Sequence, residues 1–240
     1  MIIEKIAKSK LINYIFKNTP ISTNILVASI RIVGNLATNP DYICDLLIDD
    51  GAIEFLNDCF NVEDKKILKE ALWSLSNFFA CSKNVISKIL EKEEFLKNLK
   101  NLFNQNSALV KEELLYAIGN MFHNCDLTLA KKLFDLNFDD EILFVLTDTK
   151  NPNLLFLILE LIDRISNIPY YEEIQSIQNQ EMENETYPKY NNKVQNPLVK
   201  DLVFKGLLDA LENIISNSNN DDVVGRTTLL IERLKEEIQN

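Results

Sequence analysis

The sequence predicts an all-α superhelical solenoid, built from a helical unit that repeats along the chain. Three segments, centred on Asn35, Asn77 and Asn120, share one pattern, in which a helix with apolar spacing carries an Asn four residues after an Arg, Trp or Tyr. These asparagines are spaced by 42 and 43 residues. A fixed period of about 40–47 residues is typical of HEAT and armadillo solenoids.

A second apolar pattern repeats with the same period between the asparagines. Four positions with helical spacing recur 43 residues later, Ile53, Leu56, Cys59 and Phe60 as Leu96, Leu99, Leu102 and Phe103. Two independent patterns with one period argue against a coincidence of asparagines in an Asn-rich chain. One such unit cannot bury its apolar face alone, so stacked units are expected to share a core and to align their long helices in a row.

Composition supports the all-helical prediction and limits the classes of partner. The chain has 240 residues, 46% of them apolar, with only 5 Gly and 6 Pro, and alternating strand-like runs are few. Its formal net charge is −11. That charge disfavours nucleic-acid binding, which needs a basic surface, and favours a basic partner.

The remaining chemistry-bearing residues predict no cofactor and no metal site. Cys44, Cys59, Cys81 and Cys125 lack metal-ligand spacing and are expected to be reduced core thiols, and His123 is expected to be structural or exposed. No nucleophile–base pair or Gly-rich phosphate loop is present, so no catalytic residue is assigned and an enzyme is not expected. Without a membrane-length apolar run or a signal-peptide core, the protein is expected to be soluble, in the cytoplasm and nucleus.

Apolar spacing, prolines and capping residues predict the elements in order. The expected helices cover 2–17 (one helix or a pair), 21–37, 41–49, 52–60, 64–80, 83–91, 94–104, 107–123, 128–135, 139–148, 153–166, 198–216 and 221–238. In the first of these, Leu11, Tyr14 and Ile15 are expected to pack onto the next unit. In helix 153–166, Asp163 falls at the register of the asparagines, so this copy is degenerate.

The chain divides into three parts by composition. Residues 1–166 carry the repeats, and 198–238 are expected to close the C-terminal end of the solenoid. Between them, 167–197 is rich in Glu, Gln, Asn and Tyr and includes three prolines. This segment shows no sustained period, and we expect a flexible acidic and polar loop.

The repeated segments resemble the C-terminal armadillo repeats of the importin alpha family, adaptors that bind nuclear localisation signals. The resemblance is carried by Arg31-Ile-Val-Gly-Asn35-Leu-Ala-Thr38, Lys69-Glu-Ala-Leu-Trp73-Ser-Leu-Ser-Asn77 and Lys111-Glu-Glu113-Leu-Leu-Tyr116-Ala-Ile-Gly-Asn120. They occur in the family's order and spacing, most specifically over 24–125 and only as a pattern over 204–234. The resemblance implies an armadillo-type right-handed superhelical solenoid (an alpha-alpha superhelix) with the family's minor signal-binding groove.

The resemblance also implies the residues that would hold a Lys/Arg-rich peptide. They are Arg31, Asn35, Trp73, Asn77, Glu113, Tyr116 and Asn120. Aromatic walls stack along Lys or Arg stems, carboxamides bond the peptide backbone, and carboxylates meet the cationic heads. Arg31 would repel a basic residue nearby, and is expected to hold either peptide backbone or a neighbouring acid, whereas Lys69 is expected to be solvated.

The sequence departs from the family in ways that bear on partners. Tyr116 stands where the family has Trp, which weakens that wall. The family's earlier repeats and the basic segment that binds importin beta are not present, so docking on importin beta in the usual way is not expected.

Two functional readings remain open. The first is a non-enzymatic adaptor that binds basic nuclear localisation signals for protein import into the nucleus. The alternative is an armadillo-repeat scaffold for protein–protein interaction without transport activity. A purely architectural role also remains open for each residue, since a lone Trp in an apolar helix is commonly core and an Asn within a helix often bonds its neighbours.

Overall fold

The computed structural model describes residues 2–17, 22–105, 107–168 and 196–239, and within these ranges the chain is helical and contains no strand. The helices in chain order are α1 (Ile2–Ala7), α2 (Lys10–Lys17), α3 (Thr23–Ala37), α4 (Asp41–Asp49), α5 (Ala52–Phe60), α6 (Lys65–Phe79), α7 (Lys83–Leu90), α8 (Glu93–Asn101), the 3-10 helix η1 (Leu102–Asn104), α9 (Ala108–Asn124), α10 (Leu127–Phe134), α11 (Phe138–Asp148), α12 (Pro152–Ser166), α13 (Pro197–Phe204), α14 (Leu207–Asn217) and α15 (Asp221–Gln239).

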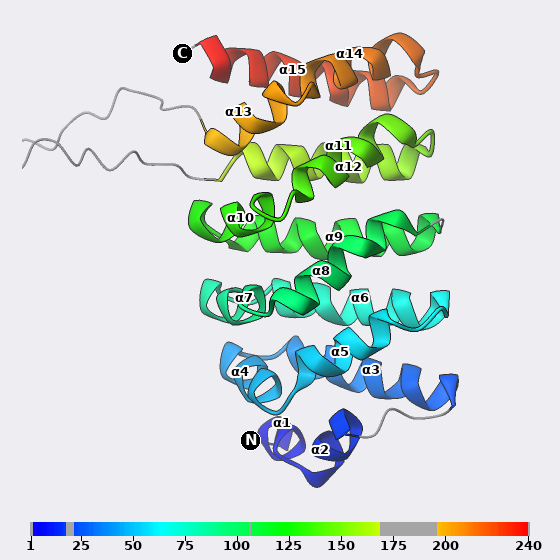
Figure 1. The fold of residues 1–240 in the computed structure, drawn as a ribbon, viewed down its shortest axis with the longest axis vertical. Helices are drawn as coiled ribbons and strands as arrows, with labels where there is room; N and C mark the ends of the chain where they lie inside the picture. Colours follow the sequence, from blue (N-terminus) through cyan, green and yellow to red (C-terminus); the bar gives the residue numbers. More distant parts are fainter. Residues whose placement is uncertain (1, 18–21, 106, 169–195, 240) are drawn as a thin grey trace, which may run out of the picture.

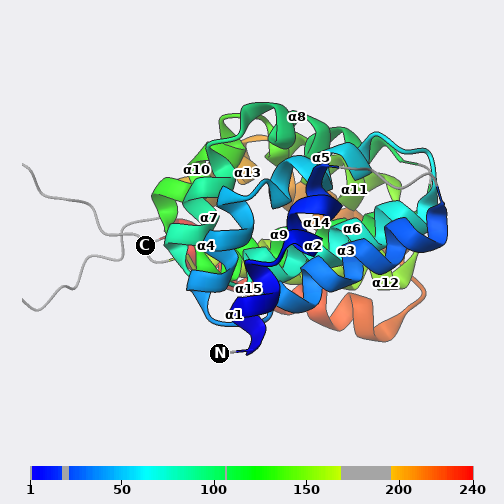
Figure 2. The ribbon, with the colours of Figure 1, turned by 90° about the horizontal axis from the view of Figure 1, so that it is seen from below.

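The described helices stack as units of three, and each unit advances one step along the long axis of the molecule (Figure 1). The units are α1–α3, α4–α6, α7–α9, α10–α12 and α13–α15. The third helix of each unit packs against the third helix of the next, so α3, α6, α9, α12 and α15 form a row. We call this row the ladder. Seen along the stack, the first, second and third helices of the units gather on different sides (Figure 2).

One continuous apolar core runs through all the units. It extends from Ala7 in α1 to Leu234 in α15, and the residues of both periodic patterns contribute to it. Its largest fully buried side chains include Phe55, Phe78 and Phe103. Burying an aromatic or aliphatic side chain stabilises a fold by about 1.5–3 kcal/mol. The stacking of units therefore provides a burial of apolar side chains that a single unit could not achieve.

Capping residues and a glycine fix where several of the helices begin. The Asp64 carboxylate caps α6 by accepting hydrogen bonds from the backbone N–H groups of Lys66 (2.8 Å) and Ile67 (3.4 Å). The Asn151 side chain caps α12, which has Pro152 in its first turn, where a missing N–H costs nothing. Gly51 ends the preceding turn with φ 106° at the start of α5.

The predicted helices 21–37 to 153–166 are confirmed, with shifts of one or two residues at their ends, except that the last turn of 94–104 is the 3-10 helix η1. The first segment is a helix pair, α1 and α2. The single helix predicted over 198–216 is wrong, because α13 ends at Phe204 and α14 begins at Leu207. Between them Gly206 takes φ 96°, a left-handed conformation that interrupts an α-helix.

The expectation for the first helix pair is only partly correct. Ile15 is buried in the core, whereas Leu11 and Tyr14 are 55% and 64% exposed. Their side chains line an apolar cavity of about 370 Å³ between α2 and α3, together with Ile25 and Ile32. The apolar spacing of 2–17 predicted the helical segment correctly, but it did not indicate which of the apolar side chains are buried.

Two further predictions concern the loop 167–197 and the absence of a membrane span. Most of the predicted loop 167–197 lies outside them, so its flexibility, and with it the three-part division of the chain, stays a prediction. In the part of the chain that the structure describes, no helix combines the length and apolar character needed to cross a membrane.

Candidate functional site

The seven residues singled out in the sequence lie on three neighbouring ladder helices. Arg31 and Asn35 are on α3, Trp73 and Asn77 on α6, and Glu113, Tyr116 and Asn120 on α9. Helix α6 packs against both α3 and α9. Because the residues of each helix are three or four positions apart, they share one face. The structure therefore gathers them on one continuous strip of the ladder, with α6 in the middle.

Trp73 lies directly on the backbone of the preceding ladder helix. A methyl group placed at Gly34 would be 2.6 Å from Cζ3 and 3.1 Å from Cε3 of the Trp73 ring. The shorter distance is one that a real Cβ atom does not show, so a side chain at this position would force the indole or the helix to shift. Trp73 remains half-buried, so the contact with α3 does not cover the residue completely.

The asparagines form a repeated hydrogen bond between ladder helices. The Nδ2 group of Asn77 donates to the carbonyl oxygen of Gly34 at 3.1 Å, and Nδ2 of Asn120 donates to the carbonyl oxygen of Ser76 at 3.2 Å. In each case the acceptor is the residue before the asparagine register of the preceding helix. The first of the register, Asn35, is exposed. The architectural reading of Asn77 and Asn120 is thus correct for at least one N–H of each carboxamide.

Arg31 and Glu70 bridge α3 and α6 through two hydrogen bonds. Nε of Arg31 donates to Oε2 of Glu70 at 2.8 Å, and Nη2 donates to Oε1 at 2.5 Å. The bonds from Arg31 hold the pKa of the Glu70 carboxyl below its usual value, against the opposing effect of burial. Of the two roles predicted for Arg31, holding a neighbouring acid is the one that the structure shows.

The next step of the ladder has a weaker ion pair in an equivalent place. Nζ of Lys69 on α6 lies 3.7 Å from Oε1 of Glu113 on α9. Burial raises the pKa of Glu113, and the nearby Lys69 partly offsets that effect. The prediction that Lys69 is merely solvated is therefore wrong, since its ammonium faces the carboxylate that was singled out for a peptide cation.

Tyr116 is 54% exposed and borders a small cavity between α9 and α12. The cavity, of about 20 Å³, is closed on one side by Arg164. Nη1 of Arg164 would lie 3.3 Å from a methyl group at Gly119, so the guanidinium covers this glycine as the indole of Trp73 covers Gly34. The same Nη1 is 3.5 Å from Oδ1 of Asn120, and Nη2 donates to Glu160 at 2.7 Å.

Each step along the ladder thus has a polar contact between side chains of adjacent third helices. Arg31 meets Glu70, Lys69 meets Glu113, Arg164 meets Asn120, and at the last step Arg233 on α15 forms an ion pair with Asp163 on α12. We call these four pairs the ladder contacts. They place a cation on every step, so the ladder face carries paired charges of both signs although the whole chain is acidic.

Three residues of the ladder were given no role by the sequence analysis, namely Gly34, Glu70 and Arg164, and Lys69 was given the wrong one. A signal existed for Glu70, which lies 43 residues before Glu113 and therefore shares its register. Gly34 and Gly119 also precede an asparagine of the register. No such signal existed for Arg164, because Glu160 and Asn120 become its neighbours only when α12 packs on α9.

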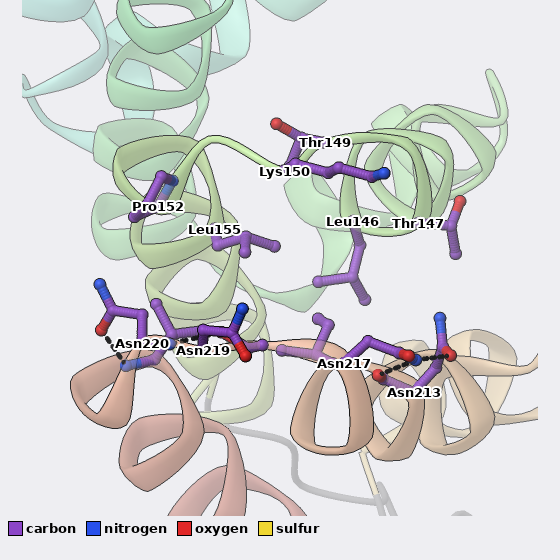
Figure 3. A pocket seen from close by; sticks show the side chains of 13 residues that line it. Leu146, Thr147, Thr149, Lys150, Pro152, Leu155, Asn213, Asn217, Asn219 and Asn220 are labelled. Carbon is purple, nitrogen blue, oxygen red and sulfur yellow. Dashed lines mark hydrogen bonds between the residues drawn. The ribbon is translucent and has the colours of Figure 1, made fainter.

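A separate cavity lies between the α11–α12 turn and the helices α14 and α15 (Figure 3). It has a volume of about 750 Å³. None of the seven predicted residues lines it. Its polar lining is dominated by amides and hydroxyls, from Thr147, Thr149, Asn213, Asn217, Asn219 and Asn220, with Lys150 at the rim.

Comparison with solved structures identifies the fold. A designed armadillo repeat protein in complex with the peptide (KR)4 matches with a TM-score of 0.74 and 19% sequence identity, over 97% of this chain and 85% of that chain. Computationally designed armadillo repeat proteins for modular peptide recognition match with a TM-score of 0.71 and 19% identity, over 96% and 84%. No protein-family model and no curated protein sequence matches the chain. The described chain is an armadillo repeat solenoid, one of the two classes that the period predicted and the one that the family resemblance implied.

Proposed function

We propose that the ladder binds a Lys/Arg-rich peptide in extended form across α3, α6 and α9, as an importin-alpha-like adaptor for nuclear localisation signals. The observation that carries the proposal is the half-buried Trp73 indole, which lies on Gly34 in a strip of the ladder that also holds two carboxylates of one register, Glu70 on α6 and Glu113 on α9. An aromatic face beside carboxylates suits a cationic side chain, whose stem stacks on the ring while its head meets the acid.

The asparagines can serve a peptide as well as the fold. A carboxamide has two N–H donors and an acceptor oxygen, and the bond from Asn77 to Gly34 uses one donor. Asn120 has less to offer, because its oxygen already faces Arg164. Asn35 is exposed at the other end of the strip. Within the proposal, the peptide backbone is held chiefly by Asn77 and Asn35, and Tyr116 contributes a second, weaker wall.

The structural neighbours support this use of the fold. One of the designed armadillo proteins was solved with (KR)4, a peptide of alternating Lys and Arg. Its sequence identity to this chain is 19%, so the likeness supports the fold and the class of ligand rather than particular contacts. The three segments that resemble importin alpha supply the particular residues.

The ladder contacts determine how tightly we expect a basic peptide to bind. Arg31 and Lys69 occupy the carboxylates that a peptide cation would use, at 2.5 Å and 3.7 Å. A basic peptide must therefore displace these side chains or share their acids. We expect micromolar binding that weakens as salt screens the charges, with the longer contact at Glu113 giving way first.

The same contacts favour a second candidate function. If the carboxylates stay paired with Arg31 and Lys69, the strip offers a peptide mixed charge rather than an acidic track. The protein would then act as an armadillo scaffold for another protein, without signal binding or transport.

Titration of a fluorescent bipartite basic peptide, followed by anisotropy, tests the proposal. The wild type, the double variant Trp73→Ala/Asn77→Ala and the control Tyr42→Ala are compared at low and moderate salt. Tyr42 is a half-exposed aromatic residue on α4, outside the strip. Salt-sensitive binding that the double variant loses and the control keeps supports the proposal. Absence of binding to wild-type protein that circular dichroism shows to be helical would reject it in favour of the scaffold.

A further inference from the structure

Two thiols from different helices meet at the edge of the second unit. Sγ of Cys44 on α4 is 3.0 Å from Sγ of Cys81, a residue 37 positions later in the turn after α6. Both cysteines are free thiols, as are Cys59 and Cys125. The sequence analysis treated all four as equivalent core thiols, and the structure separates this pair from the other two.

Backbone carbonyl groups at the ends of α3 and α6 help to position the two sulfur atoms. Both thiols face the carbonyl oxygen of Ala37 at the end of α3, with Sγ of Cys44 at 3.3 Å and Sγ of Cys81 at 3.8 Å. Cys81 also lies 3.4 Å from the carbonyl oxygen of Asn77. Ala37 is the last residue of α3, where helix carbonyls have no donor within the helix, and the Asn77 carbonyl also accepts the backbone N–H of Ala80 at 3.3 Å. The shared contact with the Ala37 carbonyl holds both side chains at the same place.

The two thiols differ in access and in acidity. Cys44 is fully buried, whereas Cys81 is half-buried and reaches solvent. The hydrogen bond from the Cys44 thiol lowers the pKa of Cys81, although burial and the carboxylates of Asp41 and Asp45 act against it. Burial raises the pKa of Cys59 and of Cys125 to about 12. Reactivity follows thiolate character and exposure, so Cys81 is the cysteine that an oxidant reaches first.

The geometry points to Cys44 and Cys81 as an oxidisable pair that closes an intramolecular disulfide when the protein meets a peroxide. In the first step the Cys81 sulfur attacks one peroxide oxygen, the O–O bond breaks, and a sulfenic acid and one water form from hydrogen peroxide. In the second step the Cys44 sulfur attacks the Cys81 sulfur, the S–O bond breaks, and the hydroxyl leaves with the Cys44 proton as a second water. Two thiols are oxidised and one peroxide is reduced.

The movement needed is small. A disulfide bond is about 2.05 Å long, so the two sulfur atoms must approach by about 1 Å. Cys81 follows Ala80, which ends α6, and it lies in the turn to α7 rather than in a helix. A shift of this turn can bring the sulfur atoms together while α4 stays in place. The resulting crosslink ties α4 to the end of the helix that carries Trp73 and Asn77.

Oxidation of the folded chain of 240 residues tests the inference. Reduced protein is treated with graded hydrogen peroxide, the remaining thiols are alkylated after denaturation, and intact mass and peptide mapping count the labels. The expected product loses two hydrogens, takes two alkyl groups where the reduced protein takes four, and yields a peptide pair joined through Cys44 and Cys81. Its urea midpoint is expected to lie above that of the reduced protein, because the crosslink restricts the unfolded chain.

Single variants separate a built pair from indiscriminate oxidation. Cys81→Ser is expected to keep its three thiols under the same treatment, and Cys44→Ser to accumulate a sulfenic acid at Cys81 that dimedone traps. Cys59→Ser is the matched control and is expected to form the crosslink as the wild type does. Equal labelling of all four cysteines at every peroxide concentration that leaves the protein folded would overturn the inference. So would crosslinking that proceeds no faster in the folded chain than in urea.

Discussion

The guanidinium of Arg31 grips the carboxylate of Glu70 at two points across the interface between α3 and α6. The Arg31 side chain is 57% exposed, whereas that of Glu70 is 11% exposed. Glu70 is therefore a mostly buried carboxylate within the ladder, and the exposed Arg31 side chain contacts it from the solvent side. Such a cation stabilises the interface, and in the proposed mode of binding it would compete with a peptide cation for Glu70.

Removing Arg31 is expected to strengthen basic-peptide binding if the ladder is the binding surface. In Arg31→Ala the Glu70 carboxylate is freed, and the affinity for a Lys/Arg-rich peptide is expected to rise about two- to fivefold, the range that an exposed ion pair contributes. Anisotropy titration at low salt measures the change. Lys65→Ala removes one positive charge from the exposed start of α6, outside the ladder contacts, and controls for net charge. Equal gains in both variants would mean that Arg31 does not compete for the site.

Gly34→Ala is expected to displace the indole. The new methyl group would lie 2.6 Å from the Trp73 ring, and overpacking of this kind costs about 1–3 kcal/mol of unfolding free energy. Trp73 is the only tryptophan, so its emission reports the displacement directly and is expected to shift to the red. Gly225→Ala is the matched control, since nothing lies within 4 Å of its added methyl group, and it is expected to gain about 0.5–1 kcal/mol from helix propensity. Unchanged emission in Gly34→Ala would contradict the contact.

The two glutamates of one register are expected to affect stability in opposite ways as pH changes. The pKa of Glu70 is lowered by Arg31, so its stabilising contribution is present above the ordinary value, about 4.3 for a glutamic acid, and is lost as pH falls through the lowered pKa. The pKa of Glu113 is raised by burial, so it destabilises the fold at neutral pH, and this effect disappears as pH falls to the ordinary value. Glu70→Gln is therefore expected to be less stable than the wild type at pH 7, and Glu113→Gln more stable.

Urea midpoints of the wild type and both variants between pH 3 and pH 7 measure these contributions. The two differences from the wild type are expected to shrink at the acid end of the range. A Glu113→Gln variant less stable than the wild type at pH 7 would show that the contact with Lys69 at 3.7 Å outweighs burial. Repeating the series at high salt, where the ion pair is screened, separates the two effects.

Gly206→Ala is expected to lower the unfolding free energy by about 1 kcal/mol, because a Cβ atom is unfavourable in the left-handed conformation. Gly206 has φ 96° and open space around it, so strain rather than a clash is the cause. Urea denaturation measures the loss, and Gly225→Ala again supplies the control in a regular helix. A gain in stability would instead support one continuous helix over 198–216.

The period of the sequence was sufficient to predict the ladder, because apolar spacing and the asparagine register both report contacts that every unit repeats. It also placed Trp73 and Asn77 at one interface. It failed at Gly206, where apolar residues continue at helical spacing through Val203, Leu207 and Leu211 and give no sign of the break. Periodicity indicates which face of a helix is buried. A change of backbone conformation at one glycine leaves that pattern unchanged, so the break between α13 and α14 could not be predicted from it.

The ladder contacts were harder to predict because they join residues far apart in the chain. Arg31 and Glu70 are separated by 39 positions, and the sequence left two roles open for Arg31. The pairing of Cys44 with Cys81 depends on how the turn after α6 returns to α4, which no spacing rule specifies. Charge and register show which side chains are available, but only packing decides which of them meet.

The contacts around Gly34 have a consequence for how such a chain can change in length. Glu113, Tyr116 and Asn120 lie 43 residues after Glu70, Trp73 and Asn77, so excising one period between α3 and α9 would bring Glu113 opposite Arg31, and would set Tyr116 and Asn120 against Gly34. The joint between units would be rebuilt from equivalent residues. A whole unit can thus be lost or gained while the interface between its neighbours is kept. The length of the solenoid then changes in steps of one unit.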